Sequence, residues 1–391
     1  MQNATAPLRI LEIVDTLDAG GMEAQLVALI NRLDIAEFEF QIVCLRHAGV
    51  YAQKLRKEVK VHELKKRPGF QWELAMNIGK IARQGRFNVI HTHNWAPLVY
   101  TCIGTFGGLT NPILHGEHSQ LNKNETTPKR LWLRRLLFKC CEKVHTVSAG
   151  QKKELLHLGF NHSHLCSLVN GVDTSRFQPI YEDSERIALR ERLLPGSSRD
   201  FWIGTVARFG TYKRHRELIS AFEQAMHINR HSRLILVGDG GPEKEGVMRQ
   251  IETSPMRNRI HFMGYQTEPT QFYQAMDLLV VPSTNEGLSN ATLEAMACGV
   301  PVLSNAICGA RELIGENEAG WVADLNSIES LRDALQSVVQ RSDSDLHEHG
   351  QSGRSRVLKH FSWESMAQRY SEIFHTCSNL NLIRRRAIGK R

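Results

Sequence analysis

The chain of 391 residues holds 49 lysines and arginines against 41 aspartates and glutamates, a formal net charge of +8, and is 41% hydrophobic. This length suits two domains of ordinary size, and the composition excludes a disordered or fibrous protein. No run approaches the ~18 apolar residues of a membrane span, and no secretory signal is evident, so a cytoplasmic location is expected.

The positive charge is concentrated in the first half of the chain. Residues 1–180 hold 23 basic and 15 acidic residues, a balance of +8, whereas residues 181–391 hold 26 of each. A basic surface attracts anionic membranes or phosphorylated substrates, and without a nucleic-acid motif no nucleic acid is expected as a partner. The eight cysteines lack metal-type spacing, which predicts reduced thiols that pack as small hydrophobic residues.

Strands that alternate with helices are predicted along the first half. The apolar run at 8–14 is typical of a buried strand, and an amphipathic helix begins near Glu23. Between them, Gly20 and Gly21 form a tight turn whose amides could approach a phosphate closely, although an ordinary strand–turn–helix junction fits the same residues. Further strands are predicted within residues 38–45, 59–64, 88–94, 111–120 and 144–155.

Three histidines lie near the ends of these strands. His91 and His93 share one face of a strand and could hold a metal, but no acid or third ligand is near in sequence. We therefore expect no metal, with one ring packed and the other lining a cleft. His118 lies just past the following strand, at the edge where open α/β sheets bind ligands. The alternative for His118 is a surface histidine hydrogen-bonded to the backbone.

A basic amphipathic helix is predicted from residue 127 to 144. Its apolar face comprises Trp132, Leu133, Leu136, Leu137, Cys140 and Cys141, and its opposite face carries Arg130, Arg134, Arg135 and Lys139 together with Leu131 and Phe138. One interpretation is an ordinary domain helix with a solvated basic face. The other is attachment to an anionic membrane surface through residues 129–143, because basic and exposed apolar residues act together there.

The second half begins after a polar stretch, and an interdomain link is expected near 172–195. A strand is predicted at 202–207, with Arg208 leaving its end and Lys213 five residues later. Two cations at the mouth of a strand can balance the charge of a nucleoside diphosphate leaving group, although both could be surface residues. No Asp-x-Asp motif lies at a strand end, so no catalytic metal is expected.

The segment from Asp277 to Val302 is predicted to form a strand, a polar loop and a helix, with Ser289 or Asn290 as the N-cap. Free amides at this helix N-terminus suit a phosphate, whereas Glu286 and Glu294 suit sugar hydroxyls. This single motif therefore offers hydrogen-bond donors for the phosphates and acceptors for the hydroxyls of a nucleotide-sugar. The simpler alternative is that Glu286 is a solvated acid of the loop and that Glu294 is only a partner of the helix dipole.

The sequence EGLSNATLEAMACGVPV resembles the Glu-x7-Glu signature of the group 1 glycosyltransferases, retaining enzymes of the GT-B fold. GGME, HGEH, NGVD and an Arg-x4-Lys pair match at the corresponding places, so the resemblance covers nearly the whole chain, and it is greatest to bacterial exopolysaccharide sugar transferases. It implies an α/β protein of two Rossmann-like domains facing across a cleft. Residues 1–180 would form the acceptor-side domain and 181–362 the nucleotide-sugar domain. Residues 363–391 would form a helix crossing back, with a tail at 384–391 that adds to the basic surface.

The resemblance also implies roles for individual residues. A catalytic role is implied for Glu286, His118, Arg208 and Lys213. Donor binding is implied for Gly20, Gly21, Arg208, Lys213, Tyr265, Glu286, Gly287, Leu288, Ser289 and Glu294. In this scheme Glu294 holds the ribose, Tyr265 lies near the base, and His118 and Glu286 lie near the sugar. Two positions depart from the family, since Arg214 and Cys308 stand where glycine is usual.

The implied reaction is transfer of a hexose, with retention, from a UDP- or GDP-linked donor to a saccharide or lipid-linked acceptor in exopolysaccharide synthesis. No cofactor is expected, and the departing phosphate oxygen would take the acceptor's proton. One alternative is a nucleotide-sugar epimerase on the same fold. The other is a non-catalytic, membrane-attached scaffold, in which the motif residues would be expected to be lost, whereas here they are intact.

Overall fold

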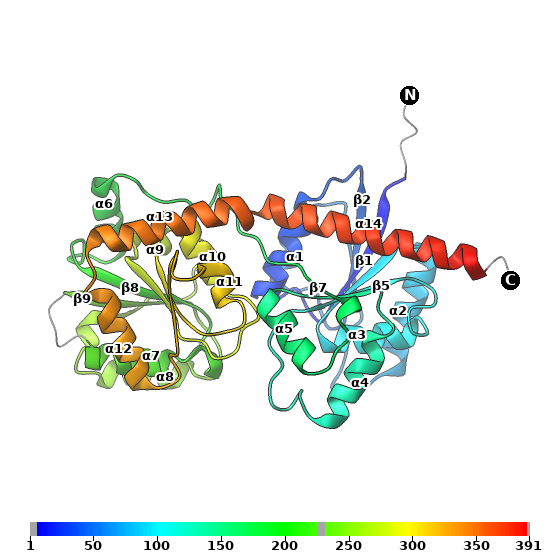
Figure 1. The fold of residues 1–391 in the computed structure, drawn as a ribbon, viewed down its shortest axis with the longest axis horizontal. Helices are drawn as coiled ribbons and strands as arrows, with labels where there is room; N and C mark the ends of the chain where they lie inside the picture. Colours follow the sequence, from blue (N-terminus) through cyan, green and yellow to red (C-terminus); the bar gives the residue numbers. More distant parts are fainter. Residues whose placement is uncertain (1–5, 226–230, 389–391) are drawn as a thin grey trace. The chain divides into compact units, whose positions relative to one another are not determined.

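The computed structural model describes the backbone of residues 6–225 and 231–388, and the side chains of these residues except His162 and 381–388. The chain forms two compact units (Figure 1). The first comprises Met1–Gly171 with Trp363–Arg391, and the second comprises Val172–Ser362. The expected domain boundary at residue 180 lies inside the second unit, and the C-terminal helix belongs to the first.

The first unit is built on a seven-stranded sheet, in the order β3-β2-β1-β4-β5-β6-β7, with every neighbouring pair parallel. Its strands are β1 (Leu8–Val14), β2 (Phe38–Cys44), β3 (Lys60–Glu63), β4 (Val89–His93), β5 (Ile113–Glu117), β6 (Lys143–Thr146) and β7 (Leu165–Ser167). Its α-helices are α1 (Gly21–Arg32), α2 (Trp72–Gly85), α3 (Trp95–Gly104), α4 (Pro128–Phe138), α5 (Ala149–His157) and α14 (Trp363–Ile388).

Alternation along β1 fills the two faces of this sheet. Ile10 and Val14 pack with α1 and with Phe374 of α14, whereas Leu11 and Ile13 pack with α2 on the other face. Glu12 lies on the same face as Ile10 and Val14, because side chains two residues apart in a strand point to one side. A fully buried acid therefore interrupts an otherwise apolar face.

The second unit is built on a six-stranded sheet in the order β10-β9-β8-β11-β12-β13, again parallel throughout. Its strands are β8 (Phe201–Val206), β9 (Ser232–Val237), β10 (Ile260–Phe262), β11 (Leu278–Val281), β12 (Val302–Asn305) and β13 (Gly320–Ala323). Its α-helices are α6 (Asp183–Leu193), α7 (His215–Ala225), α8 (Lys244–Thr253), α9 (Thr270–Ala275), α10 (Asn290–Ala297), α11 (Ala310–Ile314), α12 (Ile328–Val339) and α13 (Asp343–His360). The expectation of two Rossmann-like α/β domains is confirmed for each unit taken by itself.

Two local predictions are corrected. The helix expected at 127–144 ends at Phe138, because Glu142 N–H donates to Ile113 O (2.8 Å) and the chain then pairs with β5 as β6. The segment expected as a link at 172–195 contains α6, whose Arg186 and Arg190 both pair with Asp277 at 2.8 and 2.6 Å.

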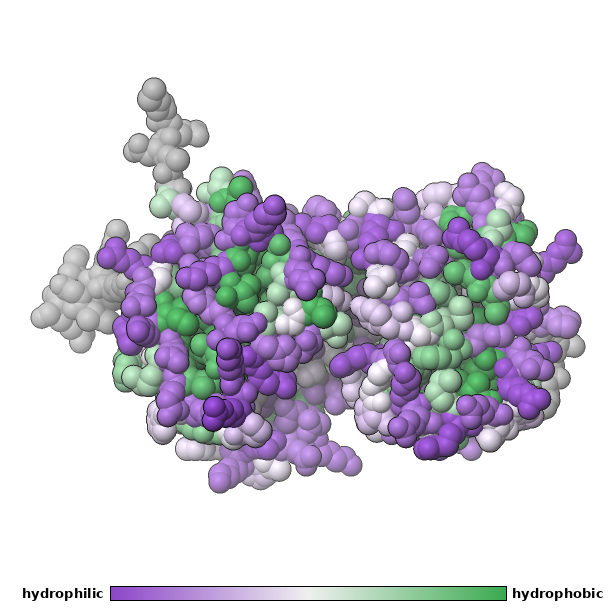
Figure 2. Space-filling model, turned by 180° about the vertical axis from the view of Figure 1, so that it is seen from behind, coloured by the Kyte–Doolittle hydropathy of each residue, from purple (hydrophilic) through white to green (hydrophobic). Residues whose placement is uncertain are grey.

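The surface of each unit is mostly hydrophilic, with separate hydrophobic patches on the face drawn in Figure 2. Among the described residues, none of the helices combines the length and the hydrophobicity that crossing a bilayer requires. Each of the eight cysteines is free, as the sequence predicts.

Candidate active site

The strand order places a topological switch point in each unit. The chain builds the sheet outward from β1 in one direction and from β4 in the other, and it does the same from β8 and β11. Open α/β sheets bind ligands outside the carboxyl ends of the strands at such a point. The predicted residues Arg208 and Glu286 follow β8 and β11, and His118 follows β5, next to β4.

Lys213 and Glu286 form an ion pair at the switch point of the second unit. The Lys213 Nζ atom lies 2.6 Å from Glu286 Oε1, and the side chains are 19% and 11% exposed. Sequence analysis assigned these residues to different parts of a donor, and the structure brings them into direct contact. Arg208 is exposed and forms no ion pair within the part of the chain that the structure describes, so its guanidinium is available to an anion.

The turn that carries Lys213 is stable without the usual glycine. Arg214 has φ +57° and ψ +41°, a left-handed conformation that costs a side-chain-bearing residue about 1–2 kcal/mol. Its guanidinium offsets this cost by donating to Leu325 O and, at 3.0 Å, to Asn326 O, and by pairing with Glu217 at 3.4 Å. Arg214 in place of the usual glycine is therefore compatible with the same turn.

The loop before α10 is held at both ends. Ser289 is the N-cap, its hydroxyl accepting from Thr292 N–H at 3.3 Å, and Leu288 is buried. An added Cβ at Gly309 would come within 2.7 Å of Gly287 O, so α11 approaches this loop too closely for a larger residue. Cys308 in place of glycine is half-buried and leaves this approach intact.

Glu294 lies in the second turn of α10 and is half-buried. Tyr273 donates its hydroxyl to Glu294 Oε2 at 2.6 Å. Burial raises the pKa of Glu294 to about 7, although the Tyr273 bond and Arg176 oppose this. The folded protein thus binds this proton more tightly than the unfolded chain, whose glutamates titrate near 4.5. The contribution of Glu294 to stability therefore falls as the pH rises from about 4.5 to about 7 and is constant above that.

Under the ribose-binding role that the resemblance implies for Glu294, the affinity for a nucleotide-sugar such as UDP-glucose is expected to rise about tenfold between pH 6 and pH 8, because a carboxyl group of pKa about 7 goes from roughly 10% to 90% ionised. Tyr273 already donates to Oε2, and protonation of the other oxygen would turn an acceptor of the ribose hydroxyls into a donor. A nucleotide sugar is the right probe, since its diphosphate does not titrate in this range. Calorimetric titration should show this rise in the wild type and a flat profile in Glu294→Gln. An equal slope in both proteins would contradict the assignment of Glu294.

Tyr265 lies beyond the carboxyl end of β10 and is 56% exposed. Gly264 before it has φ +68°, and its carbonyl accepts from Gly238 N–H at 2.9 Å. No hydrogen bond or ion pair joins Tyr265 to the other predicted donor residues among those described, so its place near a base stays a prediction. A cavity of about 1290 Å³ in the second unit lies at the opposite edge of the sheet, where Asp277 and Pro301 line it. It contains none of the predicted residues.

In the first unit, Gly20 is the N-cap of α1 and has an extended backbone. An added Cβ there would collide with the Glu23 carboxylate, which therefore lies over the turn. A phosphate approaching Gly20 and Gly21 would have to displace this half-buried acid. The predicted role of the two glycines is compatible with the geometry only if Glu23 moves.

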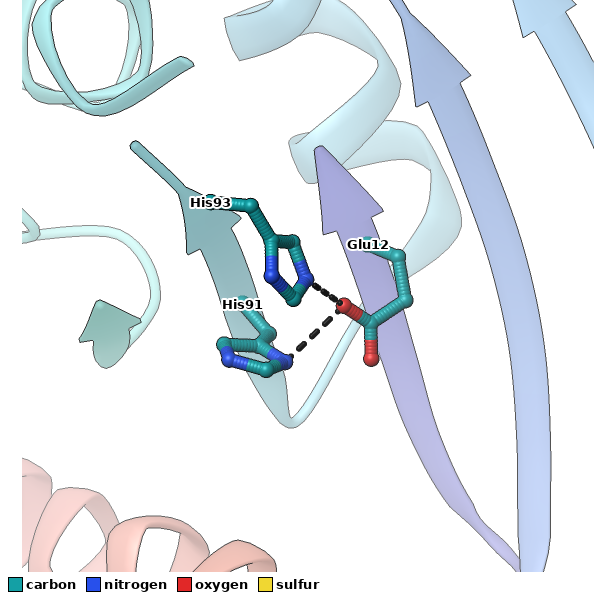
Figure 3. Close-up of side chains that lie close together, drawn as sticks. All are labelled: Glu12, His91 and His93. Atoms are coloured by element: carbon teal, nitrogen blue, oxygen red, sulfur yellow. Dashed lines mark hydrogen bonds and ion pairs between the residues drawn. The ribbon is translucent and has the colours of Figure 1, made fainter. Parts of the chain in front are cut away.

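Glu12, His91 and His93 form a buried cluster across β1 and β4, and Figure 3 shows both rings turned toward the carboxylate. Glu12 Oε2 lies 2.9 Å from His91 Nδ1 and 2.8 Å from His93 Nε2. Within the described chain, these are the residues whose ligand atoms, all within 4.8 Å of one another, could hold a metal. Glu12 could not be predicted from the sequence, because it lies far from His91 and His93 in the chain and only the pairing of Glu12 with His91 in the sheet brings it close.

His118 is connected to this cluster. Its Nε2 atom lies 2.8 Å from His93 Nδ1, and its backbone N–H donates to Asn94 Oδ1 at 3.3 Å. The alternative of a surface histidine bonded to the backbone through its ring is therefore wrong. The ring instead belongs to a chain of buried polar groups that ends at the carboxyl edge of the sheet.

The orientation of α4 differs from the amphipathic projection of its sequence, which places Arg134 on the solvated basic face. Arg134 is buried and donates to Glu117 Oε1 at 2.9 Å, and its guanidinium lies 4.7 Å from the Trp95 ring centroid. Trp132 is 63% exposed and Leu136 is 47% exposed. The buried carboxylate of Glu117 attracts an arginine that simple amphipathicity would place in water. The exposed face of α4 consequently mixes apolar and basic side chains.

Two family models match the chain, group 1 glycosyl transferases over residues 194–356 and Glycosyltransferase Family 4 over residues 19–176. The N-acetyl-alpha-D-glucosaminyl L-malate synthase of Bacillus anthracis is 23% identical over 79% of this chain and 80% of its own length. The UDP-Gal:alpha-D-GlcNAc-diphosphoundecaprenol alpha-1,3-galactosyltransferase of Escherichia coli is 21% identical over 76% and 78%.

Solved structures share the fold. HepE of Anabaena, crystallised with UDP and glucose, superposes with a TM-score of 0.80 at 20% identity, covering 94% of this chain and 99% of that one. The sucrose-phosphate synthase of Thermosynechococcus elongatus gives 0.79 at 19% identity, covering 94% and 98%.

Proposed function

Since the chain belongs to the group 1 glycosyltransferases of the GT-B fold, we propose that it transfers a hexose from a nucleotide-sugar to a saccharide or lipid-linked acceptor, with retention of the anomeric configuration. The observation that carries this proposal is the Lys213–Glu286 pair at the switch point of the second unit, where exposed Arg208 follows the carboxyl end of β8. Cations and a carboxylate together match the diphosphate and the hydroxyls of such a donor.

The donor is proposed to be UDP-linked. UDP is named for the HepE structure and UDP-galactose for the Escherichia coli relative. Glu294 would accept from the ribose hydroxyls through the oxygen that Tyr273 leaves free, and Tyr265 would lie near the base. Arg208 and Lys213 would stabilise the diphosphate as negative charge builds on it. The amides of Gly20 and Gly21 in the first unit would contact a phosphate once Glu23 has moved from the turn. These cations supply that stabilisation without a metal ion, and no cofactor is proposed.

Glu286 would bind the sugar through its hydroxyls and hold Lys213 in place. Before the donor binds, Glu286 partly neutralises the charge of Lys213. When the donor binds, the diphosphate would share this lysine with the carboxylate. Retention then follows if the departing phosphate oxygen takes the acceptor's proton on the same face. The acceptor would belong to cell-surface polysaccharide synthesis, as the name of the diphosphoundecaprenol galactosyltransferase of Escherichia coli suggests.

A transfer assay tests this proposal. Purified protein in EDTA is incubated with UDP-glucose, UDP-galactose and UDP-N-acetylglucosamine, each with short saccharides or polyprenyl-diphosphate-linked saccharides. We expect UDP release coupled to a product whose new bond has the anomeric configuration of the donor, measured by mass spectrometry and NMR. Conversion of a donor to its epimer without an acceptor would instead establish an epimerase. Donor binding without any turnover would establish a scaffold.

We further propose that the exposed face of α4 attaches to an anionic membrane surface, where lipid-linked acceptors lie. Trp132, Leu133 and Leu136 are exposed there, beside the exposed cations Lys129, Arg130 and Lys139. Apolar insertion and attraction to anionic headgroups act together on such a face. The predicted contribution of 384–391 falls on residues whose side chains lie outside the described part of the chain.

Replacing Lys129, Arg130 and Lys139 together by glutamine is expected to weaken binding to vesicles by about a hundredfold, because each cation near an anionic surface contributes ~1 kcal/mol. The measurement is flotation with vesicles of phosphatidylethanolamine and phosphatidylglycerol at low salt. Trp132→Ala should also reduce binding, whereas Trp72→Ala, at an equally exposed tryptophan of α2, is the matched control and should not. Equal binding of the wild type to purely zwitterionic vesicles would contradict the electrostatic part.

A further inference from the structure

Glu12 is a carboxylate in a place where the sheet requires an apolar residue. It is fully buried between Ile10 and Val14 on the β1 face, and the Phe374 ring of α14 packs 5.7 Å from the His91 ring. Burying a charge is costly unless hydrogen bonds compensate it. Here a hydrogen bond with His93 Nε2 at 2.8 Å compensates part of this cost, and His91 Nδ1 lies 2.9 Å from the same oxygen. The other oxygen, Glu12 Oε1, has no hydrogen-bond partner among the described residues, and the donor site of the second unit gives the cluster no role.

The charge on Glu12 determines where the proton of His93 lies. Burial raises the pKa of Glu12, but His91 and His93 outweigh this and lower it to about 2, so the carboxylate is ionised at neutral pH. A carboxylate can only accept, and therefore His93 Nε2, at 2.8 Å, must carry a hydrogen. Burial also lowers the pKa of His93 to about 4, so this ring is neutral and its Nδ1 atom is a lone-pair acceptor.

The same reasoning extends to His118. Its Nε2 atom lies 2.8 Å from the Nδ1 acceptor of His93, so it must donate. Burial, with His93 and His91, lowers the pKa of His118 well below its usual range, and the ring is neutral. The hydrogen on Nε2 therefore leaves Nδ1 of His118 as an acceptor.

A second branch of the cluster runs through His91, and within the described chain neither His91 Nδ1 nor His145 Nδ1 forms a hydrogen bond. His91 Nδ1 lies 2.9 Å from Glu12 Oε2, and His91 Nε2 lies 2.9 Å from His145 Nε2. Gly116 of β5 lies against the outer rings of both branches, since an added Cβ would come within 2.6 Å of the His145 ring and 2.8 Å of the His118 ring. The sheet thus leaves space for these imidazoles in particular.

The end of this chain lies at a strained position of the backbone. Asn94, which follows β4, has φ +63° and ψ −176°, a conformation that is essentially restricted to glycine and that persists at functional sites. Its N–H donates to Gly116 O at 2.8 Å, and its side chain accepts from the His118 backbone. The His118 ring is therefore held from the backbone side as well as from His93.

We propose that Glu12 and His93 are positioning residues that fix His118 as the neutral tautomer protonated at Nε2, with Nδ1 presented as an acceptor to a substrate hydroxyl. The inference rests on the proposed function for its substrate class. An acceptor at the carboxyl edge of the sheet selects a sugar hydroxyl over a phosphate or carboxylate, because an anion has no proton to donate. His118 would contribute recognition of the sugar and not of the nucleotide.

A metal at the same cluster would give the opposite result. A divalent cation bound by Glu12, His91 and His93 would take the lone pair of His93 Nε2, and the hydrogen would move to His93 Nδ1. His93 would then donate to His118 Nε2, and His118 Nδ1 would become the donor. The tautomer of His118 therefore distinguishes a hydrogen-bonded cluster from a metal site.

The first test is NMR of the full chain labelled with 15N-histidine, with the His118 signals identified by their loss in His118→Asn. We expect His118 protonated at Nε2 in the wild type and in His93→Asn, whose side-chain oxygen replaces the Nδ1 acceptor. In His93→Phe the acceptor is lost, and a mixture of tautomers is expected. A His118 ring protonated at Nδ1, or one equivalent of zinc in the purified protein, would overturn the proposal.

The second test compares binding of UDP-glucose with binding of UDP. His93→Phe should weaken UDP-glucose about tenfold and leave UDP unchanged, whereas His93→Asn should resemble the wild type. A packing role predicts the reverse order, because phenylalanine keeps the ring. If the His93 variants do not fold, two variants of Glu12 replace them. Glu12→Gln retains an acceptor and should bind UDP-glucose like the wild type, whereas Glu12→Leu loses the acceptor and should bind UDP-glucose more weakly. Failure of UDP to bind the wild type would refute the proposed function, and the NMR result would still decide the tautomer.

Discussion

Glu286→Gln is expected to lower the kcat of sugar transfer by about a hundred- to a thousandfold while leaving the affinity for UDP unchanged or higher. The Glu286 carboxylate lies 2.6 Å from Lys213 Nζ, so the neutral amide frees this cation to face the diphosphate. At the same time the sugar loses a charged acceptor. Lys213→Ala should have the opposite profile for binding, since it removes a charge-assisted contact and weakens UDP about ten- to a hundredfold.

Calorimetric titration of UDP together with the transfer rate separates these effects. Glu245→Gln, an exposed acid of α8 whose side chain is 89% accessible, is the matched control and should change neither quantity. If Glu286→Gln lost UDP affinity to the same extent as Lys213→Ala, the carboxylate would be a structural support of the lysine and not a ligand of the sugar.

Arg134→Met is expected to lower the free energy of unfolding by about 3–5 kcal/mol, the usual cost of removing one partner of a buried ion pair. Arg134 donates to Glu117 Oε1 at 2.9 Å, and both side chains are at most 3% exposed. Without the arginine, the side-chain partner that Glu117 keeps within the described residues is His115, 3.3 Å away, whose pKa is lowered mainly by burial. The variant also loses the cation–π contact with Trp95.

Urea denaturation of the wild type and of three variants tests this expectation. Arg130→Met, on the exposed face of the same helix, should change the free energy of unfolding by less than about 0.5 kcal/mol. Adding Glu117→Gln to Arg134→Met should recover part of the loss, because the uncompensated charge is then gone. Similar midpoints for Arg134→Met and Arg130→Met would mean that the helix presents the basic face to water, as the sequence alone suggests.

Short-range pattern was enough to predict most strands and the ligand-binding edge. Leu278–Val281 is an uninterrupted apolar run, and Ser289 is a strong N-cap residue, so the strand, loop and helix around Glu286 follow from local chemistry. Their position at the carboxyl ends of parallel strands then follows from the fold class. The sequence did not predict the Lys213–Glu286 contact, because it depends on β8 and β11 being neighbours.

The features that the local sequence pattern did not predict have a common physical cause, because they depend on contacts between residues that are far apart in the chain. Glu12 looks like an exception in an apolar strand until β4 is placed beside β1. Arg134 looks solvated until the buried Glu117 is opposite it. The helix α13 was not predicted because glycines form part of its buried stripe, and an added Cβ at Gly350 would collide with Gly299 O. Glycine usually signals a turn, and here it permits close packing instead.

The measurement that tests the account most directly is calorimetric titration of UDP and UDP-glucose in EDTA against the wild type, Arg208→Ala and Glu294→Gln. We expect that the wild type binds both ligands, that Arg208→Ala weakens the binding of both at least tenfold, and that Glu294→Gln abolishes the rise in UDP-glucose affinity between pH 6 and pH 8. Equal affinity of the three proteins for UDP at every pH would contradict a donor site at the switch point of the second unit.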